Sequence, residues 1–294
     1  MISPPALDAR PTTFDSADGP VPCVDLASGA AQACVALQGA QLLSWVPARG
    51  GERLFHGTAT RYGAGRGIRA GIPVIFPQFA DQGPLIRHGW ARTADWSFLG
   101  IETDSGTPAA VFALDDDATS RAQWPHRYAL RLHVGLDGNT LTVALEVRNR
   151  GDAPFDFACA LHSYLRVGSL AATRLDGLAG RAFTDRSSGE TRIDAAASPR
   201  FDGEVDRTYL GCDGERRLSD GHAALRIETT GFADTVVWNP GAALAAGLSD
   251  LAPGEHDRFV CVEPACVEPR IILAPGASWR GTLRMAACED AASD

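Results

Sequence analysis

A histidine at the end of an alternating segment is the first residue whose type and setting suggest chemistry. Residues 155–168 read FDFACALHSYLRVG and alternate with a period of two, which is typical of a β-strand with two distinct faces. An imidazole titrates near neutral pH, so His162 is a candidate for proton transfer, and a purely structural role stays open. One predicted face carries Phe155, Phe157, Cys159 and Leu161, and the other, small and polar, carries Asp156, Ala158, Ala160, His162 and Tyr164.

A glutamate follows a second apolar segment, residues 258–270, which reads RFVCVEPACVEPR. We expect the strand to end at Glu263, because Pro264 has no N–H to donate to a neighbouring strand. A carboxylate at the rim of a buried strand is costly unless it is used or paired. The tetrapeptide CVEP recurs five residues later, so Glu268 is a rival candidate and the pattern alone does not choose between them.

A basic segment spans residues 61–92, where five arginines and one acidic residue, Asp81, give a local charge of +4. Arg69, and His88 together with Arg92, suit an anion site, because guanidinium forks match phosphate oxygens in pairs. The glycine after Arg69-Ala70 would allow close approach of the backbone. The other three, Arg61, Arg66 and Arg87, are interpreted as solvated surface charges.

The composition excludes several classes of function. The 294 residues carry a net charge of −9, which disfavours nonspecific binding of nucleic acid. All 27 basic residues are arginine, which excludes lysine Schiff-base and pyridoxal chemistry and the P-loop lysine. No apolar run approaches the roughly 20 residues needed to span a bilayer, and the N-terminus lacks the pattern of a secretory signal. We therefore expect a cytoplasmic protein without membrane or nucleic-acid partners.

The seven cysteines favour reduced thiols, because their number is odd and no CxxC spacing occurs. Cys261 and Cys266 are conceivable metal ligands. No histidine lies near them in the sequence, however, so we interpret them as small core residues and expect no metal site.

Short strands separated by turns dominate the chain, and one short helix is predicted around Asp117–Gln123. Residues 181–200, polar and alanine-rich, are interpreted as an excursion from the sheets. The pattern predicts an all-β fold in which residues 1–294 form a single large antiparallel β-sandwich domain. The expected strands include Ala33–Leu37, Gln41–Trp45, Ala109–Leu114, Ala129–Val134, Thr140–Val147, Ala223–Thr229, Thr235–Trp238 and Phe259–Glu263.

Together these segments resemble the aldose 1-epimerase superfamily, in particular its hexose-6-phosphate mutarotase branch. The resemblance covers about residues 35–285 and departs from the family pattern at Gln78 and Ala80, where an aromatic and a glycine are common in bacterial members. The motifs that carry it, in the family's order, are IRAGIPVIFPQF, HGWAR, LHSYLRVG, EVDRTY, VVWNP, SDL, VCVEP and LAPGASW.

The resemblance implies a galactose-mutarotase-like sandwich with a shallow cleft. His162 matches the family's general acid, and Glu263 its general base, which favours Glu263 over Glu268. Arg69, His88, Arg92 and Asp206 match positions that contact the sugar or its phosphate. An ion pair between Asp206 and Arg207, or another arginine, remains an alternative for that carboxylate.

The implied activity is that of an isomerase of the glucose-6-phosphate 1-epimerase type, interconverting the α and β anomers of a D-hexose 6-phosphate without metal or cofactor. The resemblance also implies a monomer. We expect Glu263 ionised and His162 protonatable near neutral pH, with a bell-shaped pH dependence. Two alternatives stay open: an aldose 1-epimerase acting on unphosphorylated sugars, and a noncatalytic carbohydrate-binding sandwich.

Overall fold

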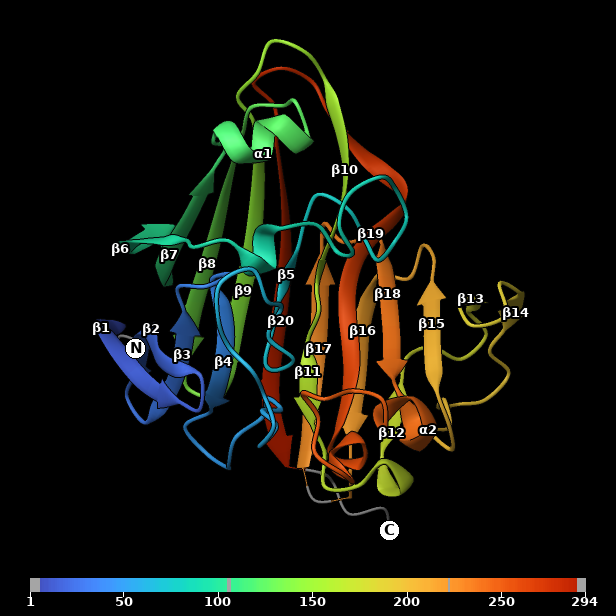
Figure 1. Ribbon diagram of the computed structural model, residues 1–294. Helices are drawn as coiled ribbons and strands as arrows, with labels where there is room; N and C mark the ends of the chain where they lie inside the picture. Colours follow the sequence, from blue (N-terminus) through green and yellow to red (C-terminus); the bar gives the residue numbers. More distant parts are fainter. Residues whose placement is uncertain (1–5, 105–106, 222, 290–294) are drawn as a thin grey trace.

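Antiparallel β-sheet makes up nearly all of the regular structure in the computed structural model, which describes residues 6–104, 107–221 and 223–289 (Figure 1). Three sheets are present among these residues. The N-terminal sheet has the order β1-β2-β3-β4, formed by Asp8–Ser16, Gly19–Ser28, Ala31–Ala36 and Gln41–Val46.

The second sheet contains the strands that carry Asp206 and Glu263, and His162 lies between two of its strands. Its order is β14-β13-β15-β18-β19-β10-β5, and β11 pairs with β19 beyond the end of β10. The strands are β5 (Val74–Ile75), β10 (Phe155–Leu161), β11 (Tyr164–Arg166), β13 (Ala182–Asp185), β14 (Thr191–Ile193), β15 (Val205–Tyr209), β18 (Asp234–Asn239) and β19 (Phe259–Leu273).

The third sheet packs behind the second and has the order β12-β16-β17-β20-β9-β8-β7-β6 (Figure 1). Its strands are β6 (Ser97–Asp104), β7 (Thr107–Asp115), β8 (Tyr128–Asp137), β9 (Thr140–Asn149), β12 (Arg174–Asp176), β16 (Gly214–Ser219), β17 (Ala223–Thr230) and β20 (Ser278–Glu289).

Helices are few and short. The α-helices are α1 (Ala118–Gln123) and α2 (Gly241–Ala245), and the 3-10 turns are η1 (Ala91–Thr93), η2 (Leu170–Ala172) and η3 (Glu255–Arg258). None of the helices in the described residues has the length and apolar character needed to cross a membrane.

One hydrophobic cluster joins the three sheets. It includes Trp45 from the N-terminal sheet, Phe157 and Val262 from the second sheet, and Leu145 and Met285 from the third. Because side chains alternate along a strand, the neighbours of these residues in the second sheet point to its opposite, outer face. That outer face is where the candidate residues lie.

The strand predictions are confirmed, since each expected segment lies within, or within one residue of, an observed strand. The predicted helix is α1, and the side chain of Asp117 caps it by accepting a hydrogen bond from the Ser120 N–H at 2.7 Å. The expectation that residues 181–200 are an excursion from the sheets is wrong for part of the segment, because β13 and β14 lie within it and extend the edge of the second sheet.

The expected end of the strand at Glu263 is wrong, because β19 continues through Pro264 to Leu273. The N–H of Val262 donates to the Ser163 carbonyl at 3.2 Å, and alternation places the backbone nitrogen of Pro264 on the same side. On that side the neighbouring strand changes from β11 to β10, so the ladder is already interrupted there. The missing donor of Pro264 is therefore tolerated.

The segment between β4 and η1 contains β5 and lies along the edge of the second sheet beside β10 and β11, where it appears in light blue and cyan in Figure 1. Gly71 anchors it: its φ is +54°, and a Cβ there would lie 1.8 Å from the carbonyl oxygen of Leu42 in β4. The glycine that the sequence associates with an anion site thus allows close approach to β4, and it does not line the cavity described below.

We predict that Gly71→Ala destabilises the fold through this contact, by about 1–3 kcal/mol beyond the cost of the positive φ. Gly138→Ala is the matched control, since Gly138 has a φ of +55° and open space where a Cβ would lie. Urea unfolding of both variants measures the difference. Equal losses in the two variants would contradict a steric role for Gly71.

Candidate active site

His162 and Glu263 face each other because of the register between β19 and its two partners. Ala160 pairs with Ala265 on one side of the interruption, and Tyr164 pairs with Cys261 on the other. Continuing either register into the gap places position 162 opposite position 263. The His162 Nδ1 and Glu263 Oε1 atoms are 3.4 Å apart.

The backbone holds His162 from its other side. Its N–H donates to the Pro73 carbonyl at 2.9 Å, and the N–H of Tyr164 donates to the Gly71 carbonyl at 2.8 Å. The imidazole stacks on the Tyr164 ring, with centroids 4.8 Å apart and planes only 8° from parallel. The orientation of the ring is therefore fixed by packing.

Both side chains are almost fully buried, His162 being 8% exposed and Glu263 1% exposed. The Nδ1 atom of His162 and the Oε2 atom of Glu263 have no hydrogen-bond partner in the described part of the chain. Unpartnered buried polar atoms are costly, and they mark this pair as a place where a ligand would complete the bonding.

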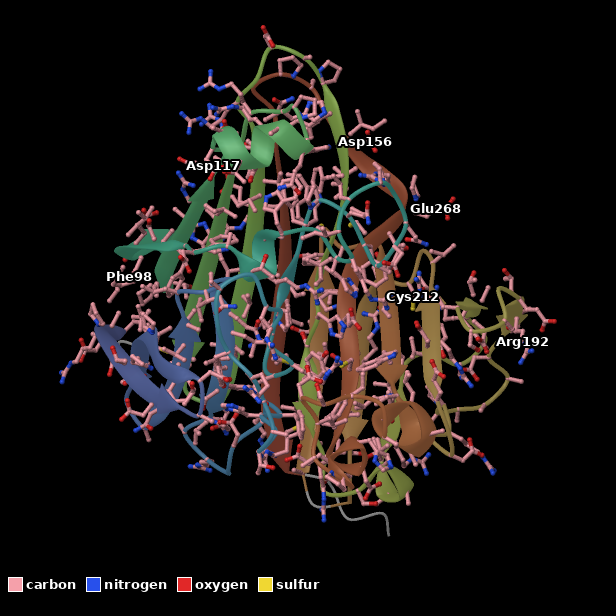
Figure 2. The ribbon with its side chains drawn as sticks, in the orientation of Figure 1. Phe98, Asp117, Asp156, Arg192, Cys212 and Glu268 are labelled. Atoms are coloured by element: carbon pink, nitrogen blue, oxygen red, sulfur yellow. The ribbon has the colours of Figure 1, made fainter. Side chains whose placement is uncertain are left out.

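A cavity of about 350 Å³ opens above the pair. All six residues singled out from the sequence line it: Arg69, His88, Arg92, His162, Asp206 and Glu263. The rival, Glu268, is exposed and does not line this cavity, and Figure 2 shows it at the edge of the molecule.

Cross-strand pairing in the second sheet brings segments that are distant in the sequence together at the cavity. Asp206 pairs with Trp238, Trp238 with Cys261, and Cys261 with Tyr164, which forms one row across four strands. The next row on the same face contains Val236, Glu263 and His162. Alternation along each strand keeps both rows on the outer face.

The arginines of the cavity differ in how far they are neutralised. The Nε of Arg69 donates to Asp250 at 2.9 Å, and Arg87 pairs with Asp81. No carboxylate of the described residues pairs with Arg92, whose Nε is buried without a partner and whose Nη2 donates to the Arg87 carbonyl at 3.0 Å. The interpretation of Arg87 as a surface charge is therefore incomplete, because this exposed side chain also lines the cavity.

Arg186 is a cavity residue that the sequence reasoning missed. Its Nε lies 3.5 Å from Asp206 Oδ1, and its guanidinium lies over the Phe79 ring, 5.5 Å from the centroid. Arg207 instead pairs with Asp194, so the alternative of an ion pair for Asp206 is realised with a different arginine. Arg186 follows β13 in the polar excursion, where no sequence pattern distinguishes it from a solvated charge.

Three further cavity residues, Glu204, Trp238 and Asp250, were also not identified from the sequence, although each lies within a motif quoted for the resemblance. Four acidic and four arginine side chains line the cavity in total among the described residues. The +4 charge of the basic segment is therefore not the net charge of the cavity. Arg61 and Arg66 of that segment do not line the cavity, and Asp206 and Asp250 add carboxylates to it.

Gln78 organises the loop that carries His88. Its amide donates to the carbonyls of Ala80 and Leu85 at 3.0 and 3.1 Å, and its Oε1 accepts from the Leu85 N–H at 2.9 Å. The Ala80 N–H in turn donates to His88 Nδ1 at 3.2 Å, which leaves Nε2 of His88 to carry the proton. Both Ala80 and His88 have positive φ angles, of 45° and 66°. The polar glutamine thus fixes a strained loop at a position where the family commonly has an aromatic residue.

The protonation expected from the sequence is not the one that burial favours. Burial raises the pKa of Glu263 well above its usual range, with a smaller contribution from Asp206. Burial, followed by Arg92 and Arg69, lowers the pKa of His162 to about 3. Both shifts favour the uncharged forms, a carboxylic acid and a neutral imidazole, which together hold the same number of protons as the expected ion pair.

Burial also favours the uncharged forms of Asp206 and His88. Burial raises the pKa of Asp206 to about 6, although Arg186 opposes the rise. Burial also lowers the pKa of His88 strongly, helped by the nearby His162 and Arg92. His88 is consequently a neutral hydrogen-bond donor at the cavity wall throughout the physiological pH range.

Three side chains of types that can bind a metal ion lie close together beneath the cavity. Ligand atoms of His162, Cys261 and Glu263 lie within 4.8 Å of one another. The sequence reasoning overlooked this combination because His162 is far from Cys261 along the chain. Burial raises the pKa of the Cys261 thiol well above its usual range, so the thiolate that binds zinc is disfavoured.

We predict that Glu263→Gln stabilises the protein increasingly as the pH rises. The folded state keeps a proton on Glu263 that the unfolded chain releases near its ordinary pKa, so stability is lost as pH increases from there through the raised pKa. Each pKa unit of difference corresponds to about 1.4 kcal/mol. Glutamine has no such proton to lose.

The test compares melting temperatures of Glu263→Gln and the wild type at pH 5 and pH 8. The exposed Glu268→Gln, from the second copy of the same tetrapeptide, is the matched control and should show no pH-dependent gain. A difference for Glu263→Gln that does not grow with pH would contradict a protonated, buried Glu263.

Several known proteins are similar to this chain in sequence and in fold. A relative from Cenchrus ciliaris, named "Putative glucose-6-phosphate 1-epimerase", is 32% identical over 272 residues, covering 88% of this chain and 83% of that protein. A relative of the same name from Escherichia coli K12 is 34% identical over 239 residues, covering 80% of this chain and 79% of that protein.

A solved structure from Salmonella typhimurium, described as a "putative mutarotase", superposes with a TM-score of 0.85 at 26% identity and covers 95% of this chain and 94% of its own. The expected all-β sandwich of the galactose mutarotase type is thereby confirmed. The profile of the aldose 1-epimerase family matches residues 22–286. By sequence and by fold, this chain belongs to the aldose 1-epimerase family.

Proposed function

We propose that this protein interconverts the α and β anomers of a D-hexose 6-phosphate, with His162 and Glu263 as the acid–base pair. The observation that carries the proposal is the 3.4 Å approach of these two buried groups beneath a cavity lined by four arginines. The names of the relatives from Cenchrus ciliaris and Escherichia coli support the same activity.

Ring opening requires one proton to leave the anomeric hydroxyl and another to reach the ring oxygen. His162 and Glu263 share one proton that either group can carry, and burial favours its place on the Glu263 carboxyl group. Transfer of that proton from Glu263 to His162 Nδ1 gives a carboxylate and an imidazolium without a change in net charge. The carboxylate then accepts the proton of the anomeric hydroxyl, and His162 donates its Nε2 proton to the ring oxygen as the C1–O5 bond breaks. Closure on the other face of the aldehyde reverses these transfers.

Arg92 and Arg69 are the proposed partners of the phosphate. Arg92 offers an unneutralised guanidinium, and the Arg69 guanidinium faces Tyr164 and Trp238 at the cavity wall. We assign Asp206 and the neutral donor His88 to the sugar hydroxyls. A monomeric, cytoplasmic enzyme that needs no cofactor completes the proposal.

An aldose 1-epimerase for unphosphorylated sugars is the second candidate, and the neutralisation of Arg69 by Asp250 is the observation that favours it. A free sugar needs no unpaired cation, whereas Arg92 has no carboxylate partner in the described residues. We therefore place the phosphorylated sugar first.

We predict that His162→Ala and Glu263→Gln each lower kcat for a hexose 6-phosphate by about 10²- to 10⁴-fold, because each removes one of the two proton-transfer groups. NMR exchange between the anomers, with the uncatalysed rate subtracted, measures the effect. Glu268→Gln is the control and should turn over like the wild type. A near-normal kcat in either site variant would refute the assignment, and wild-type exchange at the uncatalysed rate for all sugars would favour the carbohydrate-binding alternative.

We predict that Arg92→Gln and Arg69→Gln lower kcat/KM for a hexose 6-phosphate roughly 10- to 100-fold without lowering it for the free hexose. A hydrogen bond to a charged group contributes about 1.5–3 kcal/mol, which corresponds to this range. Arg61→Gln is the control, because Arg61 pairs with Asp18 outside the cavity. Equal losses for both sugars would favour the enzyme for unphosphorylated sugars.

A further inference from the structure

Two arginines of the cavity oppose the proton that His162 must carry. Arg92 and then Arg69 are, after burial, the largest causes of the low pKa of His162. Arg69 Nη1 lies 3.4 Å from the Tyr164 hydroxyl, and the Tyr164 ring stacks on the imidazole. The guanidinium groups that lower the pKa of His162 are therefore the same groups that would bind an anionic substrate.

Other charged and titratable groups around His162 do not cancel this effect. Cys261 and Glu263 face it from β19, and burial raises the pKa of both side chains well above its usual range, which favours their uncharged forms. Tyr164 from β11 and His88 from the preceding loop are uncharged at neutral pH. Arg87 contributes a further positive charge from that loop. The arginines consequently dominate the field at the imidazole.

A dianion between Arg92 and Arg69 would change that field. It would neutralise the guanidinium that has no carboxylate partner in the described residues and compete with Asp250 for the other. In a hexopyranose 6-phosphate the phosphate is attached through C6 to C5, which also bears the ring oxygen. A phosphate at the arginines therefore lies on the same side of the sugar as the oxygen that receives the proton.

We propose that the phosphate group of the substrate, by pairing with Arg92 and Arg69, makes His162 a competent proton donor, so that the phosphate contributes to turnover as well as to binding. The inference rests on the proposed function. The proton moves from Glu263 to His162 only after the phosphate has been bound, and no proton enters from solvent. Sugars without a phosphate would enter the cavity but meet a neutral pair.

The test supplies the sugar and the phosphate-like anion as two separate molecules. D-Xylose lacks the C6 group, and phosphite dianion is the probe that stands in for the missing phosphate. Anomer exchange of D-xylose is followed by NMR with and without phosphite, and the exchange that phosphite catalyses without enzyme is subtracted. We expect phosphite to raise the enzymatic kcat/KM for D-xylose at least 10-fold.

Variants make the outcome specific. Arg92→Gln should abolish phosphite activation and also raise the phosphite-free kcat/KM for D-xylose severalfold, because one opposing charge is gone. A site that uses Arg92 only to hold phosphate would show no such gain. Arg61→Gln, outside the cavity, should keep wild-type activation, and circular dichroism and melting temperatures establish that the variants fold.

Turnover of a hexose 6-phosphate is measured in parallel on the wild type. If it is catalysed but phosphite does not activate D-xylose, the coupling is wrong and the proposed function stands. If phosphite activates equally in the wild type and Arg92→Gln, the coupling is also wrong. If no hexose 6-phosphate is turned over, the proposed function itself fails.

Discussion

The register of β10 and β11 against β19 is the constraint on which the rest of the site depends. Between β10 and β11 the chain leaves its pairing with β19, and position 162 falls opposite position 263 at that gap. The register is the same on both sides of the gap, so it sets these two positions side by side. It places two titratable side chains 3.4 Å apart and nearly inaccessible to water.

Burial gives this pair its chemical character. Removal from water disfavours the charged form of either group, so each pKa moves toward neutrality of its side chain. The favoured form of the pair therefore keeps the shared proton on the carboxyl group. The arginines of the cavity influence this balance, because Arg92 and Arg69 lower the pKa of His162 and Arg186 opposes the rise in the pKa of Glu263.

The loops over the sheet are held by backbone contacts as much as by side chains. Gly71 lies against β4 so closely that no other residue fits, and Gln78 joins both ends of the loop before His88. Gly67 lies against the guanidinium of Arg92, where a Cβ would come within 3.2 Å of its central carbon. The arginines and His88 are therefore presented by segments whose own geometry is fixed, although these segments have little regular structure.

The sequence alone determined the strands, the two faces of the histidine strand, and the types of residue able to move a proton or bind an anion. These follow from local alternation and from side-chain chemistry. The choice of Glu263 over Glu268 came from the resemblance, and of these two residues Glu263 alone lines the cavity. Tertiary structure decided the direction in which burial shifts the pKa of each group of the pair, the continuation of β19 through Pro264, and the positions of Arg87 and Arg186 at the cavity. The physical reason is the same in each case: burial, register and the field of distant charges depend on segments that are far apart in the chain.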